Sequence, residues 1–403
     1  MQHFVVVGAG QAGSSLVSKL RSEGFGGKIT LIGAEAEPPY QRPPLSKAYL
    51  LGEMPKDRLY LRPKSFYTDQ NIDLMLDTRA VDLDSERKVL TLSTGEELNY
   101  DALALTTGSH PRTLPAAIGG TLDGVMTVRD LRDADTMAPY FAAGKKALII
   151  GGGYIGLEAA AVAAKRGVDV TLVEMADRIL QRVAAPQTSD FFRDLHTKHG
   201  VKVLEGVGLD TLIGDEHVSG AKLTAGSEID IDFAIVGVGI VPATALAEAG
   251  NLDIENGIKT DAHARTSDPS IWAAGDCATC HFKGSDIRIE SVGNAIDQAE
   301  VAAKNMLGLD VPFQPKPWFW SDQYDCKLQI AGLNMGYTDV VVRAGDDGAV
   351  SHWYYEGGTL IAVDAMNDAR NYMIGKRLIE AGKSPAPDVI ADPDTDMKAL
   401  LRA

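Results

Sequence analysis

The chain has 403 residues, of which 45% are hydrophobic, and it carries a formal net charge of −16. One hydrophobic core does not organise a chain of this length, so two or three domains are expected. The apolar fraction and the 41 glycines are typical of a soluble α/β protein, and the longest apolar runs fall well short of a membrane span. The charge disfavours nucleic acid and anionic membranes as partners.

The first predicted element is a strand at residues 4–7, followed by the glycine fingerprint Gly8-Ala9-Gly10-Gln11-Ala12-Gly13 and a helix that ends near Gly24. No basic segment precedes this strand and no cleavage site follows it, so we expect no signal peptide and a cytoplasmic protein. In this motif the first glycine permits a tight turn, the second lets the backbone approach a pyrophosphate, and the third lets the helix pack closely. The helix N-terminus then faces the phosphate charge. A second strand at 28–32 leads to Glu35, where an acid commonly binds ribose hydroxyls.

A proline-rich segment, residues 38–44, is predicted to lack regular structure until Ser46, which is expected to cap a short helix. Short strands are predicted at 88–92 and 102–105, and the second of them ends at a close turn around Gly108. A linker rich in proline and glycine follows.

The glycine fingerprint appears a second time as Gly151-Gly152-Gly153-Tyr154-Ile155-Gly156, after a strand predicted at 147–150. The next strand, 168–173, leads to Glu174, again at the ribose position. A later strand, 233–236, ends at a glycine turn that contains Gly239. One such motif is weak evidence, but two copies in a strand–turn–helix setting predict two dinucleotide sites and electron transfer between their cofactors.

The pattern changes after Pro242. A strand at 271–274 ends at Asp276, and a helix is predicted to follow the segment 290–294 and to run to about Leu307. The last part alternates like antiparallel strands and ends in a helix at 371–380, and the acidic stretch 392–396 is expected to be a solvated tail.

The segment Cys277-Ala278-Thr279-Cys280-His281 matches two known patterns by spelling, the redox dithiol and the haem attachment site. Haem attachment requires an exported segment, and a redox dithiol is expected at the start of a thioredoxin-like helix. The favoured interpretation is a pair of small buried thiols in a turn.

Five ordered blocks beyond the glycines resemble the NADH-dependent ferredoxin reductase family, whose members are FAD enzymes of glutathione-reductase-like fold. The blocks span 43–50, 151–158, 274–278, 290–295 and 317–324. The resemblance implies an α/β fold with two nested Rossmann-like dinucleotide-binding domains plus a C-terminal α+β interface domain. FAD would bind residues 1–108 and 242–315, NADH would bind 109–241, and 316–403 would form the interface domain.

The resemblance also carries over individual site residues. Those expected to contact FAD are Gly8, Gly10, Ala12, Gly13, Glu35, Arg42, Lys47, Val81, Gly108, Arg129, Asp276, Val292 and Trp320. Those expected to contact NADH are Gly151, Gly153, Ile155, Gly156, Glu174, Arg182 and Gly239. A carboxylate at Glu174 repels a 2′-phosphate, so NADH is expected over NADPH. By pattern alone, Val81 and Val292 are core residues and Asp276 is compatible with a helix N-cap.

Three residues are expected to act on the chemistry. Lys47 would lie beside the flavin ring, paired with Glu158, because a cation there stabilises reduced anionic flavin. Trp320 would be an aromatic neighbour of the flavin. The alternatives from pattern alone are a surface lysine, an ordinary helical acid and a core tryptophan.

The function implied is transfer of electrons from NADH to FAD as hydride, and then singly to a 2Fe-2S ferredoxin that feeds a monooxygenase or dioxygenase. Ferredoxins are usually acidic, so a basic rim at Arg58, Arg62, Lys64 and Lys327 is a candidate docking surface, with scattered surface charge as the alternative.

Three other functions are compatible with the pattern. A rubredoxin reductase would share the scaffold. An NADH oxidase would carry a reactive cysteine in the first domain, and no cysteine precedes Cys277. A nucleotide-controlled interaction flavoprotein related to apoptosis-inducing factor would need an insertion or targeting segment.

Overall fold

The computed structural model describes residues 1–402, which form two compact units assembled from separate stretches of the chain. Unit 1 contains Met1–Gln41, Lys56–His110 and Ile240–Pro317. Unit 2 contains Arg42–Pro55, Pro111–Gly239 and the described chain from Trp318 onward. The predicted α/β class is confirmed, and the division into three domains stays a prediction.

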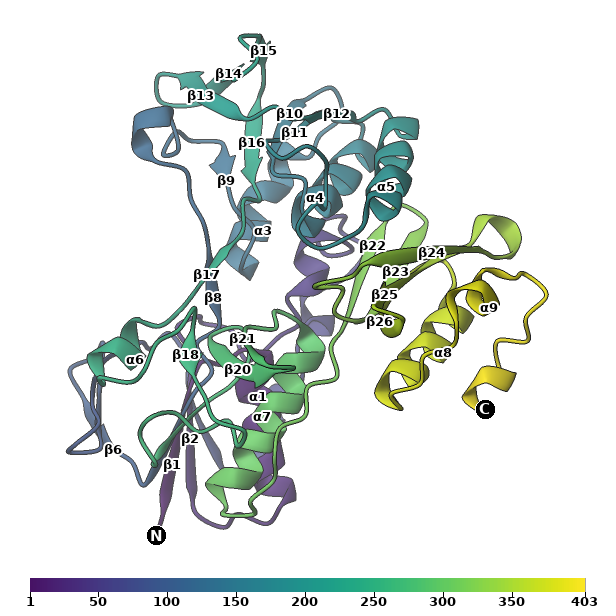
Figure 1. Ribbon diagram of the computed structural model, residues 1–403. Coiled ribbons are helices and arrows are strands. Elements are labelled where there is room, and N and C mark those ends of the chain that lie inside the picture. Colours follow the sequence, from purple (N-terminus) through teal and green to yellow (C-terminus); the bar gives the residue numbers. More distant parts are fainter. Residues whose placement is uncertain (403) are drawn as a thin grey trace. The chain divides into compact units, whose positions relative to one another are not determined.

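Unit 1 is built on a five-stranded parallel sheet with the strand order β19-β7-β1-β2-β3, of which Figure 1 labels β1 and β2. Its strands are β1 (His3–Val7), β2 (Lys28–Ile32), β3 (Ile72–Met75), β7 (Ala102–Leu105) and β19 (Ile271–Ala273). Because β1 pairs with both β2 and β7, the direction of strand addition reverses there. The carboxyl end of β1 is therefore a switch point of the kind at which open α/β sheets bind ligands.

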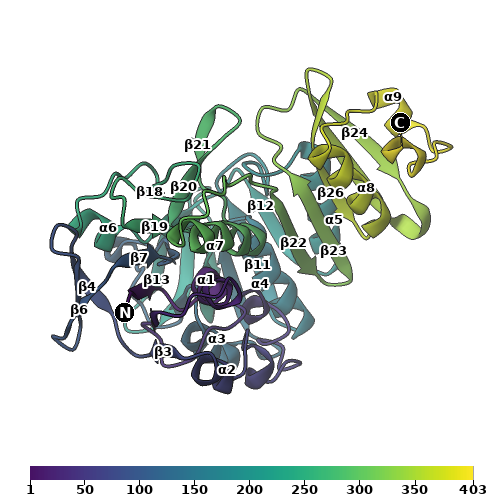
Figure 2. The ribbon, with the colours of Figure 1, turned by 90° about the horizontal axis from the view of Figure 1, so that it is seen from below.

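Helices α1 (Gln11–Ser22) and α7 (Val292–Met306) lie side by side in unit 1 (Figure 2). Their contact is rich in alanine, since Ala295, Ala299 and Ala302 share one buried cluster with Ala12 and Leu16. Small side chains allow the two helices to pack closely. The other helices of this unit are α2 (Lys64–Asp69) and α6 (Ala245–Ala249).

Small sheets complete unit 1. One antiparallel sheet contains β4 (Ala80–Asp84), β5 (Val89–Leu92) and β6 (Glu97–Asn99). A second, mixed sheet contains β18 (Ile258–Lys259), β20 (Ala278–Phe282) and β21 (Ser285–Ile287), with β18 parallel and β21 antiparallel to β20. Strands β8 (Ser109–Pro111) and β17 (Ile240–Pro242) form a two-stranded sheet where the chain passes between the units.

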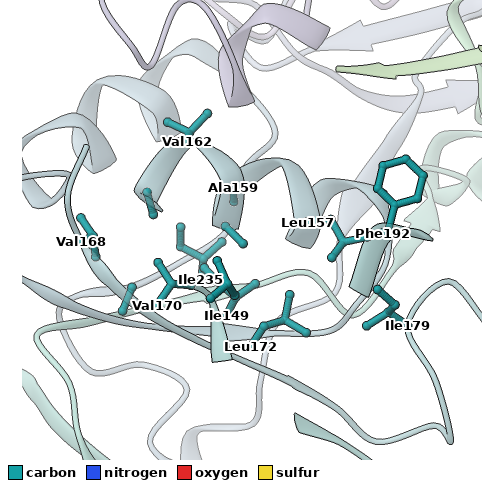
Figure 3. Close-up of a cluster of buried hydrophobic side chains, with 14 of the residues drawn as sticks. Ile149, Leu157, Ala159, Val162, Val168, Val170, Leu172, Ile179, Phe192 and Ile235 are labelled. Carbon is teal, nitrogen blue, oxygen red and sulfur yellow. The ribbon is translucent and has the colours of Figure 1, made fainter. Parts of the chain in front are cut away.

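Unit 2 contains a five-stranded parallel sheet with the order β12-β11-β10-β16-β9, which repeats the arrangement of four strands of unit 1 but takes its edge strand β9 from before the other strands in the chain. Its strands are β9 (Val125–Met126), β10 (Lys146–Ile150), β11 (Asp169–Glu174), β12 (Lys202–Glu205) and β16 (Phe233–Val236). Figure 3 shows Ile149, Leu172 and Ile235 from this sheet packed against Leu157 and Ala159 of helix α4 (Tyr154–Lys165). This buried cluster packs β10 against α4 and so fixes the position of the second glycine turn, which joins them.

The same part of unit 2 contains helices α3 (Leu131–Met137) and α5 (Pro186–Lys198) and an antiparallel sheet of β13 (Leu209–Gly214), β14 (Val218–Leu223) and β15 (Glu228–Asp230). The expectation for Ser46 is wrong, because Pro43–Ser46 itself forms a 3₁₀ helix that ends at Ser46. Proline suits the first positions of a helix, since their N–H groups have no partner inside it.

The C-terminal part of unit 2 is an antiparallel sheet with the order β22-β23-β26-β25-β24, packed against helix α8 (Ala369–Glu380). Its strands are β22 (Trp318–Gln323), β23 (Cys326–Gly332), β24 (Asp339–Ala344), β25 (Val350–Glu356) and β26 (Thr359–Met366). At the end of helix α9 (Pro387–Ala391) and just beyond it, the Arg343 guanidinium donates to the carbonyls of Ile390, Asp392 and Pro393. Residues 392–396 are mostly exposed, as expected for a solvated tail, but their backbone is tied to β24. Within the described residues, no helix is long and apolar enough to cross a membrane.

Candidate functional site

The two glycine turns have the same crowded backbone. Gly8 has a φ of +113° and Gly151 a φ of +105°, a region that L side chains rarely adopt. A Cβ at Gly8 would lie 2.1 Å from the Thr106 carbonyl oxygen, and one at Gly151 would lie 2.4 Å from the Gly237 carbonyl oxygen. A Cβ at Gly13 or Gly156 would come within 2.0 or 2.1 Å of the carbonyl oxygen of the first glycine in its own turn. These four positions accept only glycine.

The middle glycine of each turn faces open space. Among residues 1–402, no atom would lie within 4 Å of a Cβ added at Gly10 or Gly153. Helices α1 and α4 also begin without a capping side chain from the described chain, whereas Ser291 caps α7. The exposed helix amides and the open glycine form a cradle suited to an anionic pyrophosphate. The residues present therefore fit two bound dinucleotides.

In each unit an acid lies at the carboxyl end of the strand that comes after the glycine-turn helix: Glu35 follows β2, and Glu174 is the last residue of β11. Glu35 accepts a hydrogen bond from the Tyr40 hydroxyl. Glu174 accepts from the backbone N–H of Gly152 at 2.7 Å and from that of Ala176 at 2.8 Å. Each carboxylate oxygen has two lone pairs, so both acids keep capacity to accept from ribose hydroxyls.

Asp276 follows β19 and precedes β20, so the helix N-cap alternative is wrong. The Ser109 hydroxyl donates to its carboxylate at 3.2 Å. Val292 is the partly buried first residue of α7, and Gly108 has a φ of +71° at the end of the neighbouring turn. The proposed FAD contacts of these three residues stay predictions.

Other residues assigned to FAD lie in different surroundings. Val81 is 55% exposed on β4, so its interpretation as a core residue is wrong. In unit 2, Arg42 donates from Nη1 to the Arg129 carbonyl oxygen at 2.9 Å, which links the 3₁₀ helix to the segment before α3. No contact with FAD is tested for these residues.

Two arginines flank the glycine turn after β16. Gly239 has a φ of +103°, and a Cβ there would lie 3.9 Å from Arg182 Nη2 and 3.8 Å from Arg112 Cδ. Arg182 was predicted from the sequence as an NADH contact. Arg112 was not predicted, because it lies 127 positions before Gly239 in the chain. Ile155 is 45% exposed in the first turn of α4. An exposed apolar side chain beside an open glycine is compatible with a contact to the nucleotide.

The structure brings Lys47 and Glu158 together in unit 2. Lys47 Nζ lies 2.9 Å from Glu158 Oε1, and the two side chains are 16% and 4% exposed. The Ser46 hydroxyl donates to Oε2 at 2.9 Å, and the Ser321 hydroxyl donates to Oε1 at 2.6 Å. The sequence did not indicate that these serines are partners of Glu158, because they lie 112 and 163 positions away. Their side chains satisfy a buried carboxylate that would otherwise carry a large desolvation penalty.

Trp320 is partly exposed on β22 and stacks on Trp318, with 5.5 Å between ring centroids. Lys376 Nζ lies 5.4 Å from the Trp318 ring centroid. The core of the C-terminal sheet instead buries Trp353. The interpretation of Trp320 as a core residue is therefore wrong, and its role beside the flavin stays a prediction.

All three cysteines are free and buried. The Cys277 thiol donates to the carbonyls of Leu105 and Ala274, and burial raises its pKa. Burial also raises the pKa of Cys280 to about 11. Because the thiolate is the reactive form, both groups are inert at neutral pH. The interpretation of Cys277 and Cys280 as buried thiols agrees with the structure, but their placement in a turn is wrong for Cys280, which lies in strand β20.

The candidate docking residues are exposed. In unit 1, the Arg62 guanidinium lies 5.4 Å from the Phe66 ring centroid and Lys64 Nζ lies 5.7 Å from that of Tyr60. Arg58 and, in unit 2, Lys327 are also exposed. Their role in binding a partner stays a prediction.

Two family models match the chain. Residues 2–299 match the pyridine nucleotide-disulphide oxidoreductase model, and residues 318–401 match the reductase C-terminal model. The chain belongs to the pyridine nucleotide-disulphide oxidoreductase family. The expectations of an oxidoreductase, of FAD and NAD(H) as its cofactors and of Rossmann-type nucleotide-binding sheets are confirmed for this family member.

Full-length relatives are ferredoxin reductases. The 5,5′-dehydrodivanillate O-demethylase ferredoxin reductase subunit of Sphingobium sp. is 41% identical, with 100% of each chain covered. The crystal structure of the covalent putidaredoxin reductase–putidaredoxin complex matches with a TM-score of 0.96 and 37% identity, covering 100% of this chain and 98% of that one. Rubredoxin-NAD(+) reductase of Pseudomonas putida is 37% identical over 90% of this chain and 95% of its own. The resemblance to ferredoxin reductases is thereby confirmed over the whole oxidoreductase chain.

Proposed function

We propose that this oxidoreductase takes electrons from NADH and passes them, through FAD, one at a time to a 2Fe-2S ferredoxin that serves an oxygenase. The observation that carries the proposal is the duplicated cradle, in which Gly10 and Gly153 stand open beside uncapped helix N-termini. One cradle would bind NADH, which donates two electrons, and the other would bind FAD, which passes these electrons on one at a time. The full-length ferredoxin reductase relatives support the choice of acceptor. A cytoplasmic location is part of this proposal.

When bound, FAD supplies the chemistry of accepting a hydride and releasing single electrons. The chain's own residues bind and orient the two nucleotides. The amides of α1 and α4 bind the pyrophosphates, and the Glu174 carboxylate accepts from the ribose and repels a 2′-phosphate. The Lys47 ammonium, held by Glu158, stabilises negative charge where the flavin becomes reduced. The hydride carries its proton with it, so no general acid is required for that step.

The proposal is tested with the purified protein. It should be yellow, lose its flavin absorbance when NADH is added without oxygen, and then reduce an added 2Fe-2S ferredoxin with a stoichiometry of two ferredoxins per NADH. A colourless protein that cannot be reconstituted with FAD would contradict the proposal, as would a reduced flavoprotein that no 2Fe-2S ferredoxin reoxidises.

The proposed docking surface has its own test. Arg62→Glu should raise KM for ferredoxin while turnover of NADH with ferricyanide stays normal, because steering acts on association with a charged protein. Arg132→Glu, which changes an exposed arginine on α3, is the matched control. Unchanged ferredoxin kinetics in the Arg62 variant would remove Arg62 from the docking surface.

A rubredoxin is the second candidate acceptor, and the relative named rubredoxin-NAD(+) reductase favours it specifically. Comparing kcat/KM for a rubredoxin and a 2Fe-2S ferredoxin under the same conditions discriminates between the two. A higher kcat/KM for rubredoxin than for the 2Fe-2S ferredoxin would identify rubredoxin as the acceptor. It would leave the proposed use of FAD and NADH unchanged.

A further inference from the structure

A line of buried side chains leads to Glu158 from the C-terminal sheet. Ser321 and Gln323 point the same way from β22, two residues apart, and His196 faces them from α5. All three are 0% exposed. Gln323 Nε2 lies 3.1 Å from Ser321 Oγ, His196 Nε2 lies 2.8 Å from Gln323 Oε1, and the Tyr324 hydroxyl lies 3.2 Å from His196 Nδ1.

The proton on Ser321 determines the direction of every bond in this line. Ser321 Oγ lies 2.6 Å from a Glu158 oxygen that is already paired with the Lys47 ammonium. Two oxygens at that distance require a proton between them, and only the serine hydroxyl has one to donate. Ser321 Oγ is then left as an acceptor, so Gln323 must present its N–H₂ to it and its carbonyl oxygen to His196.

The remaining bonds follow from the orientation of the Gln323 amide. Its carbonyl oxygen accepts only from a protonated nitrogen, so His196 carries hydrogen on Nε2 and accepts from Tyr324 on Nδ1. Burial lowers the pKa of His196 to about 4, so the ring is neutral and holds a single proton at neutral pH. The other ring on this side is that of His199, which stacks on Tyr324 with 3.7 Å between ring centroids.

We propose that Ser321, oriented by Gln323 and His196, acts together with Ser46 as a positioning residue that fixes the Glu158 carboxylate and, through it, the Lys47 ammonium. Each donor in the line polarises the next, and every donor points toward Glu158. A lysine side chain is flexible, because its ammonium group sits at the end of four carbon atoms. An immobile Glu158 carboxylate therefore determines the position of the Lys47 charge. The inference rests on the proposed function only in its last step, the effect of Lys47 on bound FAD.

The direction of the line is tested by nitrogen-15 NMR of the histidine rings in the FAD-loaded protein. His196 should show the Nε2–H tautomer and remain neutral from pH 8 to pH 5. Gln323→Leu, which removes the acceptor but keeps the bulk of the side chain, should change the His196 signals. A proton on Nδ1 of the wild-type ring would overturn the proposed direction, because Gln323 would then point the other way.

The effect of these serines on the position of the Lys47 ammonium is tested with three variants. Ser321→Ala and Ser46→Ala each remove a hydroxyl, whereas Ser321→Thr retains one. The alanine variants should lower the two-electron midpoint potential of bound flavin by about 30 mV, which corresponds to a tenfold change in that equilibrium. They should also slow flavin reduction by NADH with KM for NADH unchanged, and Ser321→Thr should restore both values. Ser351→Ala is the matched control, since Ser351 is equally buried on β25 and bonds to Trp353 instead.

Folded Ser321→Ala and Ser46→Ala proteins with the wild-type potential would overturn the proposal. If Ser321→Ala does not fold, the flavin potential of Ser46→Ala alone tests the proposal, because the Ser46 hydroxyl donates to the other oxygen of Glu158. Failure of the proposed function is recognised separately. A protein that holds FAD but does not reduce ferredoxin still reports its potential and the His196 tautomer.

Discussion

The two glycine turns share a backbone but differ in what surrounds them. In both, the first and third glycines are required by the protein itself, since a Cβ would meet a carbonyl oxygen 2.0 to 2.4 Å away. In both, the middle glycine meets no described atom within 4 Å, so only a ligand requires it to be small. The comparison separates glycines that determine the fold from glycines that make room for a nucleotide.

The difference between the turns lies in the residue after the first glycine and in the nearby acid. Ala9 occupies this position in unit 1, whereas a Cβ at Gly152 in unit 2 would lie 2.6 Å from Ile179 Cγ2. Glu174 is bound to two amides close to its own turn, while Glu35 is bound by a tyrosine hydroxyl. The second cradle is therefore held in place by its own ribose acid.

The largest effects are expected from Gly8→Ala and Gly151→Ala, which combine a positive φ with a clash against a carbonyl oxygen. Each should cost about 4 kcal/mol or more of unfolding free energy, measured by urea denaturation. Gly24→Ala is the control, because Gly24 has a φ of +86° and no described atom within 4 Å of a Cβ, and it should cost about 1 kcal/mol. Equal costs at the three positions would show that backbone conformation and not crowding determines the first glycine.

The two units should also respond differently to acid. Unit 2 buries His196 and His352, whose pKa values burial lowers to about 4, whereas the histidines described in unit 1 are at least partly exposed. Between pH 6.5 and pH 4 the unfolded chain binds more protons at these two residues, so stability present above pH 6.5 is lost as the pH falls. Each contributes about 3 kcal/mol.

Asp364 opposes this loss, because burial raises its pKa to about 6 and its folded form gains the proton first as the pH falls. The net expectation is a loss of about 3 kcal/mol in unit 2 from pH 7 to pH 4, visible as faster hydrogen exchange of the α5 amides. Asp364→Asn should steepen the loss and His352→Asn should reduce it. Equal acceleration of exchange in α1 would contradict the difference between the units.

The open glycines should affect binding and not folding. Gly10→Ala and Gly153→Ala should leave the stability of the cofactor-free protein within about 0.5 kcal/mol, because the new methyl group meets no described atom. Gly10→Ala should weaken FAD binding by about 30-fold, and Gly153→Ala should weaken NADH binding by a similar factor with FAD retained. Calorimetric titration measures both. A stability loss as large as that of Gly8→Ala would mean that the open space is needed by the protein.

The smallest effect is expected at the acids. Glu174→Gln should reduce the preference of kcat/KM for NADH over NADPH by about tenfold, because the repulsion of a 2′-phosphate is removed. Glu35→Gln, the corresponding change in the other cradle, should leave this preference unchanged. An equal change in both variants would contradict the assignment of the second cradle to NADH.

Local signals in the chain allowed accurate prediction of several elements. The strand at 28–32 coincides with β2, and the helix predicted to follow 290–294 corresponds to α7, which already begins at Val292 and ends one residue before the predicted Leu307. Both follow from apolar runs or helical periodicity beside residues with strong local preferences. The prediction for Ser46 was wrong, because this serine ends a 3₁₀ helix and donates to Glu158, which is distant in the sequence. Residues 392–396 are mostly exposed as expected, but the sequence did not indicate that the distant Arg343 holds their backbone.

The amino-acid sequence by itself determined the duplicated nucleotide cradle, its order along the chain and the acids that accompany it, because a glycine turn between strand and helix depends on neighbouring residues. Only the tertiary structure decided which side chains meet the Glu158 carboxylate and which cysteines are inert. Those outcomes depend on burial and on contacts between residues more than a hundred positions apart, and such contacts leave no periodicity in the chain.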